Sequence, residues 1–200
     1  MVMERTYRGV SADERRALRR HQLLDAALEL WGSPDQKITM TAICQSAHLT
    51  ERYFYESFTN LDQALVEVVD TIADRVQRAT VAALAEVDDE PVARVEAVVS
   101  AFVHTMLVDP RVGRAALIEA AGLEATRPRR DVLLRRLARL TAREARRING
   151  PATWSQDHGP LLATMFVGGI VQAVVTALDD GTETDDVVAA ATYAFRALTA

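Results

Sequence analysis

The sequence predicts an all-α protein of about nine helices, and three observations lead to that prediction. Apolar residues recur at steps of three and four along nearly every segment of the 200 residues. Helix-capping residues and the breakers glycine and proline separate those segments. No stretch alternates between apolar and polar residues for more than four positions, so no strand is expected. With 49% hydrophobic residues, a chain of this length can bury a sizeable core without disulfides.

Capping patterns mark the starts of the first four helices. Ser11 and Glu14 have the spacing of a capping box, and Asn60 with Gln63 resembles a second one. The apolar periodicity between these signals predicts helices at about 12–31, 40–47, 51–57 and 61–83, with Thr39 and Thr50 as the caps of the two short ones and Gly32-Ser33-Pro34 as the end of the first.

Prolines, glycines and acidic turns divide the second half of the chain. An acidic stretch followed by Pro91 ends the fourth helix, and Asp109-Pro110 supplies a cap and a first-turn proline for the sixth. The helices expected here cover about 92–106, 110–122, 131–148, 155 or 160–178, and 184–198, with Asn149-Gly150-Pro151 and Asp179-Asp180-Gly181 as stops.

Charge and cysteine content exclude several classes of protein. The net charge is −5, which argues against a uniformly basic nucleic-acid binder, yet residues 1–20 hold six arginines and residues 127–147 hold nine. Because Lys37 is the one lysine, nearly every cation has the forked geometry that suits phosphate. The 127–147 segment is interpreted as a solvated helix face, and whether it binds anything stays open. Cys44 stands alone and residues 1–20 lack an apolar core, so a cytoplasmic protein is expected.

Residues 159–178 form an apolar run of twenty without a formal charge, long enough to span a bilayer. The glycine pair at 168 and 169 and the polar Thr164, Gln172 and Thr176 favour instead a helix buried from several sides. We expect one face to meet its own domain and the other a second copy, without a membrane. The homodimer interface predicted on this helix and the last one comprises Gly168, Gly169, Gln172, Val175, Val188, Ala191 and Phe195.

Motifs for catalysis or metal binding are missing from the sequence. None of the four histidines has a carboxylate or a second histidine at the spacing of a helical metal site. No phosphate-binding glycine loop, dinucleotide fingerprint or nucleophile elbow occurs. The sequence therefore predicts a protein that is not an enzyme and that carries neither metal nor cofactor.

The segment 38–60, ITMTAICQSAHLTERYFYESFTN, has the proportions of a helix-turn-helix motif. Apolar residues at 43, 47, 49, 54 and 58 would face inward. Glu51, Arg52, Tyr53, Tyr55 and Glu56 would then face outward, and such arginine and tyrosine side chains can reach phosphates or guanine edges. From spacing alone, an ordinary corner between two packed helices explains the pattern equally well.

Two runs, LLDAALELWG and MTAICQSAHLTERYFYESFTNLDQALVEVV, resemble the N-terminal domain of TetR-family transcriptional regulators. The likeness covers about residues 16–77 and includes the pattern of Thr50, Phe54, Tyr55 and Phe58. It implies a flexible basic arm at 1–15, a DNA-binding domain at 16–77 with its helix-turn-helix at about 40–59, and a regulatory and dimerisation domain at 78–200.

The resemblance also implies a partner and contact residues. The partner is double-stranded operator DNA with two half-sites. The positions that match the family's DNA-facing ones are Thr39, Thr41, Thr50, Arg52, Tyr53 and Tyr55, and Arg20 in the first helix is expected on a backbone phosphate. Two residues depart from the family pattern, Arg52 where a small residue is usual and Leu61 where a lysine is usual.

A regulatory domain of this kind would hold a largely apolar small-molecule effector. The candidate contacts are Phe102, Met106, Trp154, Met165 and Phe166, with His104 as a polar contact, although the sequence favours plain core for the five apolar residues and a surface position for His104. The function expected is a ligand-responsive repressor released from DNA by the effector. The alternative is a helical-bundle enzyme or small-molecule carrier that binds no DNA.

Overall fold

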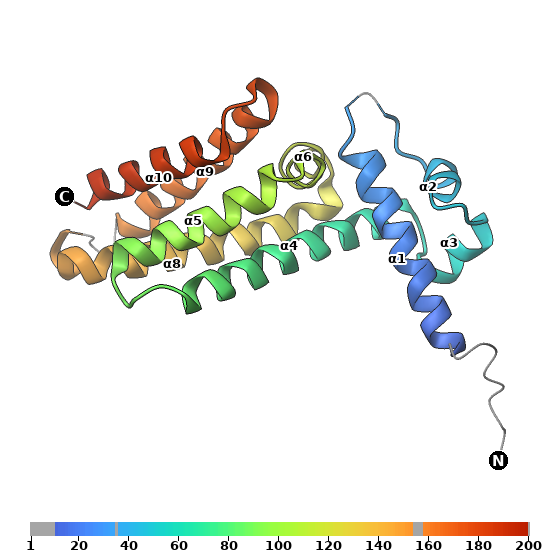
Figure 1. Ribbon diagram of the computed structural model, residues 1–200, viewed down its shortest axis with the longest axis horizontal. Coiled ribbons are helices and arrows are strands. Elements are labelled where there is room, and N and C mark those ends of the chain that lie inside the picture. The colour runs from blue at the N-terminus through green and yellow to red at the C-terminus, as the bar shows by residue number, and fades with distance from the viewer. Residues whose placement is uncertain (1–10, 35, 154–157, 200) are drawn as a thin grey trace, which may run out of the picture.

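A computed structural model describes residues 11–34, 36–153 and 158–199, and within these ranges every regular element is a helix (Figure 1). The all-α prediction is therefore confirmed for the described part of the chain. The elements are α1 Ala12–Trp31, α2 Met40–Ser46, α3 Glu51–Ser57, α4 Leu61–Ala85, α5 Pro91–Leu107, α6 Pro110–Gly113, a π-helical segment Arg114–Glu119, α7 Ala120–Gly122, a 3-10 turn Glu124–Thr126, α8 Arg127–Thr153, α9 Gly159–Asp180 and α10 Thr184–Leu198.

Side-chain caps start three of the first four helices. The capping box of α1 is complete, since the Ser11 hydroxyl accepts from the Glu14 amide at 3.1 Å and Glu14 accepts from the Ser11 amide at 2.6 Å. Thr39 and Asn60 accept in the same way at α2 and α4, whereas Thr50 makes no such bond at α3. Because α1 begins at Ala12, residues 12–15 belong to a helix and not to the expected arm, whose residues 1–10 lie outside the described ranges.

The helices of the second half follow the expected order with shifted ends. The sixth expected helix is one continuous helical run of α6, the π-helical segment and α7. Helix α8 begins at Arg127, four residues before the expected start, and Gly150 with φ of 69° breaks its course where the glycine signal predicted a stop. Gly181, with φ of 75°, ends α9 in the left-handed conformation that glycine tolerates best.

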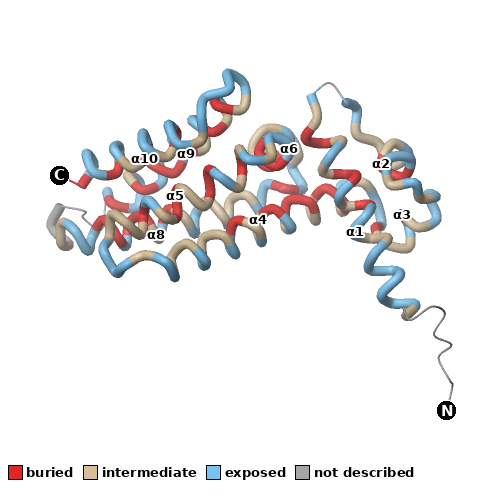
Figure 2. The backbone as a smooth tube through the Cα atoms, viewed as in Figure 1, coloured by how far each residue is buried: buried red, intermediate tan, exposed pale blue. Residues whose placement is uncertain are grey.

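Helix α4 connects two groups of helices. Helices α1, α2 and α3 cluster at one end, and α4 runs from them into the group of α5, α8, α9 and α10 (Figure 1). Helix α5 lies between α4 and α10 and also contacts α8 and α9. Figure 2 shows the buried residues along the inward sides of these helices, so α5 is the centre of the larger core.

The two groups also touch directly, where α6 meets the end of α1. Gly32, just after α1, is buried against the backbone of Arg111 in α6. A Cβ atom at position 32 would lie 2.6 Å from the Cα of Arg111, closer than real Cβ contacts come. This glycine therefore permits a backbone-to-backbone approach that no larger residue allows.

Among the described helices, α9 is long and apolar enough to cross a membrane by length and composition. One of its faces is buried against neighbouring helices of the same chain. That face carries Ala163, Phe166, Val167, Ile170, Val174 and Ala177. The other face is exposed, so α9 is a core helix on one side and an uncovered apolar surface on the other.

Candidate functional site

Two buried phenylalanines fix helix α3 on its inner side. Phe54 and Phe58 are buried with ring centroids 5.3 Å apart, and Ile43 of α2 is buried beside them, as the sequence predicted. His48, with φ of 53°, makes the turn between α2 and α3. Cys44 is buried in the same small core, and burial raises the pKa of its thiol, which fits a packing residue and not a nucleophile.

The opposite side of α3 is open to solvent. Arg52 is the most exposed cation there, with 84% of its side chain accessible, and Tyr55 is 61% exposed. Thr41 of α2 and Thr50 are exposed as well, and the Thr41 hydroxyl donates to the carboxylate of Glu51 at 3.0 Å. Two neighbouring helices thus present hydroxyl, guanidinium and phenol groups on one surface.

Tyr53 and Thr39 lie differently from the prediction. Tyr53 is half-buried and not outward, because the guanidinium of Arg19 in α1 covers its ring at 4.4 Å from the centroid. Thr39 is half-buried, and its hydroxyl already accepts from the Ala42 amide at 3.1 Å. Both side chains hold the local structure together, which leaves them less of their surface for a ligand.

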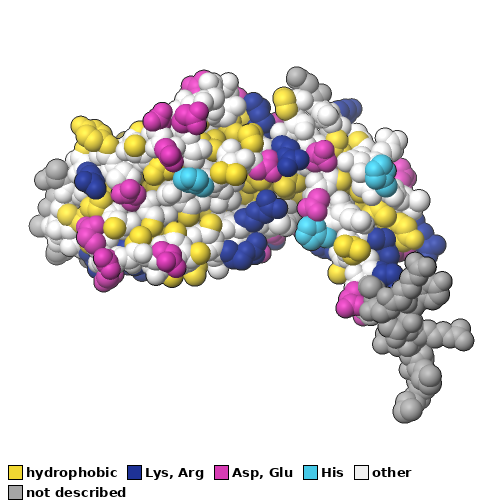
Figure 3. Space-filling model, viewed as in Figure 1, with side chains coloured by type: hydrophobic (Ala, Val, Ile, Leu, Met, Phe, Trp, Pro, Cys, Tyr) yellow, Lys and Arg dark blue, Asp and Glu magenta, His cyan; other side chains and the backbone are white. Residues whose placement is uncertain are grey.

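Three arginines contact Glu56 of α3. Arg52 donates from Nε to the Glu56 carboxylate at 3.1 Å, and the Arg19 guanidinium lies 3.9 Å from the other carboxylate oxygen. Arg16 donates to the Glu56 backbone carbonyl at 3.3 Å. Figure 3 shows basic side chains in this end of the molecule, over α1 and α3. Arg16 and Arg19 belong to the arginine-rich segment 1–20, but their contacts with α3 join helices that are distant in sequence and could not be predicted singly.

Arg20 lies between α1 and α4 instead of facing outward. Its guanidinium pairs with Glu67 of α4 and stacks over the Phe58 ring at 4.9 Å from the centroid. The sequence expected Arg20 to touch phosphate. In this structure Arg20 ties the first helix to the fourth, and Arg16 is the more exposed of the two arginines.

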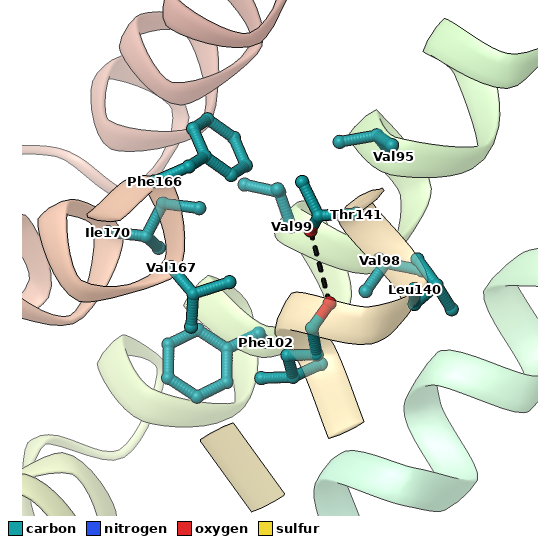
Figure 4. A pocket seen from close by; sticks show the side chains of 10 residues that line it. Val95, Val98, Val99, Phe102, Leu140, Thr141, Phe166, Val167 and Ile170 are labelled. Carbon is teal, nitrogen blue, oxygen red and sulfur yellow. Dashed lines mark hydrogen bonds between the residues drawn. The ribbon is translucent and has the colours of Figure 1, made fainter. Parts of the chain in front are cut away.

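A small apolar cavity lies between α5, α8 and α9 (Figure 4). Its volume is about 20 Å³, room for about one water molecule. Of the predicted effector contacts, Phe102 and Phe166 line it. The other lining residues, which were not among the predicted effector contacts, are Val95, Val98, Val99, Leu137, Leu140, Thr141, Val167 and Ile170.

The remaining predicted effector contacts lie elsewhere. His104 is exposed, with its ring Nδ1 2.9 Å from the Ser100 carbonyl and Nε2 3.9 Å from Asp185, so the prediction that it contacts a buried ligand does not fit its place. Met106 is buried in the core but does not line the cavity. Met165 points away from the cavity and is 65% exposed, and Trp154 lies outside the described residues.

An open apolar groove with a volume of about 390 Å³ lies between α9 and α10 on the surface of the protein. Gly168, Gly169 and Gln172 are exposed, and Val175 and Val188 are half-buried, as an interface would need. The expectation of exposure is wrong for Ala191 and Phe195. Both are buried within the chain because α10 packs on α5 and because the Phe195 ring lies 5.6 Å from Phe166.

Metal-binding clusters are absent from the part of the chain that the structure describes: no three His, Cys, Asp or Glu side chains come together there. No protein-family model and no curated protein sequence matches the chain.

Solved structures with the same arrangement of helices were found. A TetR-like transcriptional regulator from Rhodococcus sp. RHA1 superposes with a TM-score of 0.71 and 19% identity, over 92% of this chain and 94% of its own. The fatty acid degradation regulator FadR from Bacillus halodurans gives 0.73 and 15%, over 90% and 94%. The chain has the TetR fold. FadR from Bacillus subtilis, solved in complex with stearoyl-CoA, shares the TetR fold with a TM-score of 0.68 and 17% identity, over 90% of this chain and 97% of its own. The TetR fold therefore extends beyond the N-terminal third, where the sequence resemblance lies, through the helices of the second half.

Proposed function

We propose that the protein is a ligand-responsive DNA-binding transcriptional regulator, a repressor released from its operator by a small molecule. The observation that supports this most directly is the surface of α2 and α3. Two buried phenylalanines fix α3, while Arg52 and Tyr55 are exposed on its far side. A short helix that is fixed by buried side chains and exposes a guanidinium and a phenol to solvent suits the major groove of DNA.

Phosphate contacts would come from the arginines next to that surface. Arg16 and Arg19 of α1 lie beside α3, where they can reach a backbone phosphate on either side of the groove. Thr41 and Thr50 supply hydroxyls at the same surface. The DNA-binding domain in this proposal covers residues 16–77, and residues 78–200 form the regulatory domain.

A second copy of the chain is the proposed cover of the groove between α9 and α10. Large apolar side chains are exposed on these two helices, with Met165 and Leu198 in the groove and Leu161 and Tyr193 outside it. A two-fold pairing of these helices would bury them and remove any need for a membrane around α9. It would also set the distance between two recognition helices, as an operator with two half-sites requires. In this proposal the protein acts in the cytoplasm.

The proposed effector site is the cavity between α5, α8 and α9. Its lining is apolar with one hydroxyl, so a largely apolar molecule would fit once the helices separate. The stearoyl-CoA complex of a FadR with the same fold supports an effector that carries a long apolar chain. Binding there would change how α4 and α6 hold α1, and the effector would act by preferring one spacing of the two recognition helices.

The test is an electrophoretic mobility shift of the full-length protein with the DNA that flanks its own coding region, at several stated salt concentrations. We expect a specific complex whose affinity falls steeply with salt. Light scattering on the same sample should give a dimer, and Gly169→Arg should yield monomers with weak operator binding. A helical carrier or enzyme would bind no DNA specifically at any salt concentration, and that result would refute the proposal.

A further inference from the structure

A buried ionic cluster joins α5 and α8 at one end of the regulatory half. The Glu144 side chain is fully buried and accepts from Arg147 Nη1 at 2.7 Å and from Arg143 Nη2 at 2.9 Å. Arg94 of α5 lies with its Nε 3.5 Å from the same carboxylate. Burial acts to raise the pKa of Glu144, but hydrogen bonds from Arg147 and Arg143 and the nearby charges outweigh it, so this pKa lies below its ordinary value.

The cluster contains equal numbers of positive and negative side chains. Asp89, in the loop before α5, is its second carboxylate and pairs with Arg147 at 2.8 Å and with Arg94 at 3.7 Å. Three guanidinium groups therefore share two carboxylates. Glu90 also lies near, but its carboxylate is taken up by the backbone amides at the start of α5. Glu90 keeps its negative charge, so three carboxylates oppose the three guanidinium groups and the cluster carries no excess charge.

Arg94 is the member whose hydrogen bonding is incomplete. Its side chain is 18% exposed, and its Nε is buried and makes no hydrogen bond in the structure. Leaving a buried charged donor unpaired is costly, so an acceptor that could reach this atom would be bound favourably. Arg143 and Arg147 are more exposed and already hold Glu144, which they would keep if Arg94 turned to another partner.

The cluster adjoins the apolar cavity. Helices α5 and α8 run antiparallel (Figure 1), with Arg94 at the start of one opposite Glu144 near the end of the other. The cavity residues Val98 and Leu140 each lie four positions from the cluster, a step of about 6 Å along a helix. Figure 4 shows both side chains on the same side of the cavity. An apolar molecule in the cavity would thus have Arg94 one helical turn beyond its end.

We propose that the effector is an amphipathic anion whose apolar chain lies between α5, α8 and α9 and whose anionic end group binds Arg94. One buried N–H without an acceptor suits a single carboxylate, as in a fatty acid. The inference rests on the ligand-responsive part of the proposed function and does not need the DNA-binding part. The cavity must widen for such a chain, because its present volume of about 20 Å³ holds no more than a water molecule.

The test is calorimetric titration of the full-length protein without DNA. The probes are decanoate, decanol as a neutral chain of the same length, and decanoyl-CoA as the alternative source of an anion. We expect decanoate to bind at least about tenfold more tightly than decanol, since a hydrogen bond to a charged group is worth that much. Arg94→Gln should remove this preference and leave decanol binding unchanged, and Arg94→Lys should restore part of it.

Arg139→Gln is the matched control, because it removes an exposed arginine of α8 outside the cluster and should bind decanoate as the unchanged protein does. Retained decanol binding by Arg94→Gln also shows that the variant is folded. Tightest binding of decanoyl-CoA, lost in Arg94→Gln, would support an anionic end group at Arg94 with the phosphates of the CoA part as its source. The inference would be overturned if decanoate and decanol bound with equal affinity or if no probe bound. It would also be overturned if Arg94→Gln left the affinity for decanoate unchanged. Since no DNA is present, a failure to bind operator leaves this test intact.

Discussion

The Nε of Arg52 donates to the carboxylate of Glu56 at 3.1 Å, one helical turn further along α3. The most exposed cation on the proposed recognition helix is therefore held by its own helix. The same carboxylate attracts Arg19 from α1. DNA binding would require these arginines to exchange Glu56 for phosphate or for a base edge, and the cost of that exchange enters the affinity for every sequence.

Replacing Arg52 by alanine separates two roles for this residue. If Arg52 leaves Glu56 to contact a guanine edge, Arg52→Ala weakens operator binding more than binding to random DNA, by about 1–3 kcal/mol. If the ion pair with Glu56 persists on DNA, the ratio of specific to non-specific affinity stays the same. We expect the first result, measured as both affinities over a salt series, and an unchanged ratio would contradict a role in base recognition.

Replacing Glu56 by glutamine should strengthen DNA binding, whereas Arg52→Ala should weaken it. The change keeps the size of the side chain and frees Arg52 and Arg19 from a carboxylate. Because pairs this exposed contribute only about 0–1 kcal/mol, folding stability should change little. We expect tighter binding to random DNA, a steeper salt dependence and a smaller specificity ratio in filter-binding titrations. Weaker binding to all DNA would mean that Glu56 itself contacts the operator.

Arg16 and Arg20 allow a matched comparison on α1. Arg20 stacks on Phe58 and pairs with Glu67, so Arg20→Ala should lower the free energy of unfolding by about 1 kcal/mol and leave the salt dependence of DNA binding unchanged. Arg16 is exposed beside α3, so Arg16→Ala should leave stability unchanged and lower the salt slope by about one. Denaturant titrations and a salt series of DNA affinities check both. The reverse pattern would restore the role that the sequence suggested for Arg20.

Helix order was predictable because caps and breakers act locally. Ser11, Asn60 and Gly181 each satisfy or end a backbone hydrogen-bonding pattern within a few residues, so their effect can be read from the sequence. The burial of Phe54 and Phe58 followed from helical spacing for the same reason. The early start of α8 at Arg127 places Pro128 in the first turn, where proline is favoured, so the expected start at 131 left a local signal unused.

The errors concern contacts between distant segments. Tyr53 lies under Arg19 and Arg20 pairs with Glu67, and each pair joins two helices that are far apart in sequence. Phe195 faces inward because α10 packs on α5, which periodicity along α10 alone cannot show. The lining of the cavity between α5, α8 and α9 was predicted only at Phe102 and Phe166, because its aliphatic residues have the same composition as the rest of the core.

Glu144 makes stability depend on pH in a way that one variant isolates. Its pKa is lower in the folded protein than in the unfolded chain, so its contribution is complete above the unfolded value of about 4.3 and is lost as the pH falls through the folded value. At pH 7, Glu144→Gln should lower the free energy of unfolding by about 1–3 kcal/mol, because it removes an acceptor shared by buried donors. Denaturant titrations between pH 3 and 7 should show this difference shrinking toward the acid end. A difference that is constant with pH would mean that the charge of Glu144 contributes nothing.

The contact between Gly32 and Arg111 predicts a variant that affects communication between the two halves. A Cβ at position 32 would overlap the backbone of α6, and neither backbone can give way as a flexible side chain would. Gly32→Ala should therefore push α1 and α6 apart and lower the free energy of unfolding by about 1–3 kcal/mol, the usual cost of overpacking. Denaturant titration measures this loss.

Gly122→Ala is the matched control for Gly32→Ala, since a Cβ at position 122, at the end of α7, meets open space. It should leave stability equal or slightly higher, as alanine does in place of a helical glycine. If the α1–α6 contact carries the effector signal, the Gly32→Ala protein, although still able to bind operator, should respond less to its effector in the mobility-shift assay. The Gly122→Ala protein should respond like the unchanged chain. An effector response that is equally strong in both variants would place the coupling elsewhere, along α4.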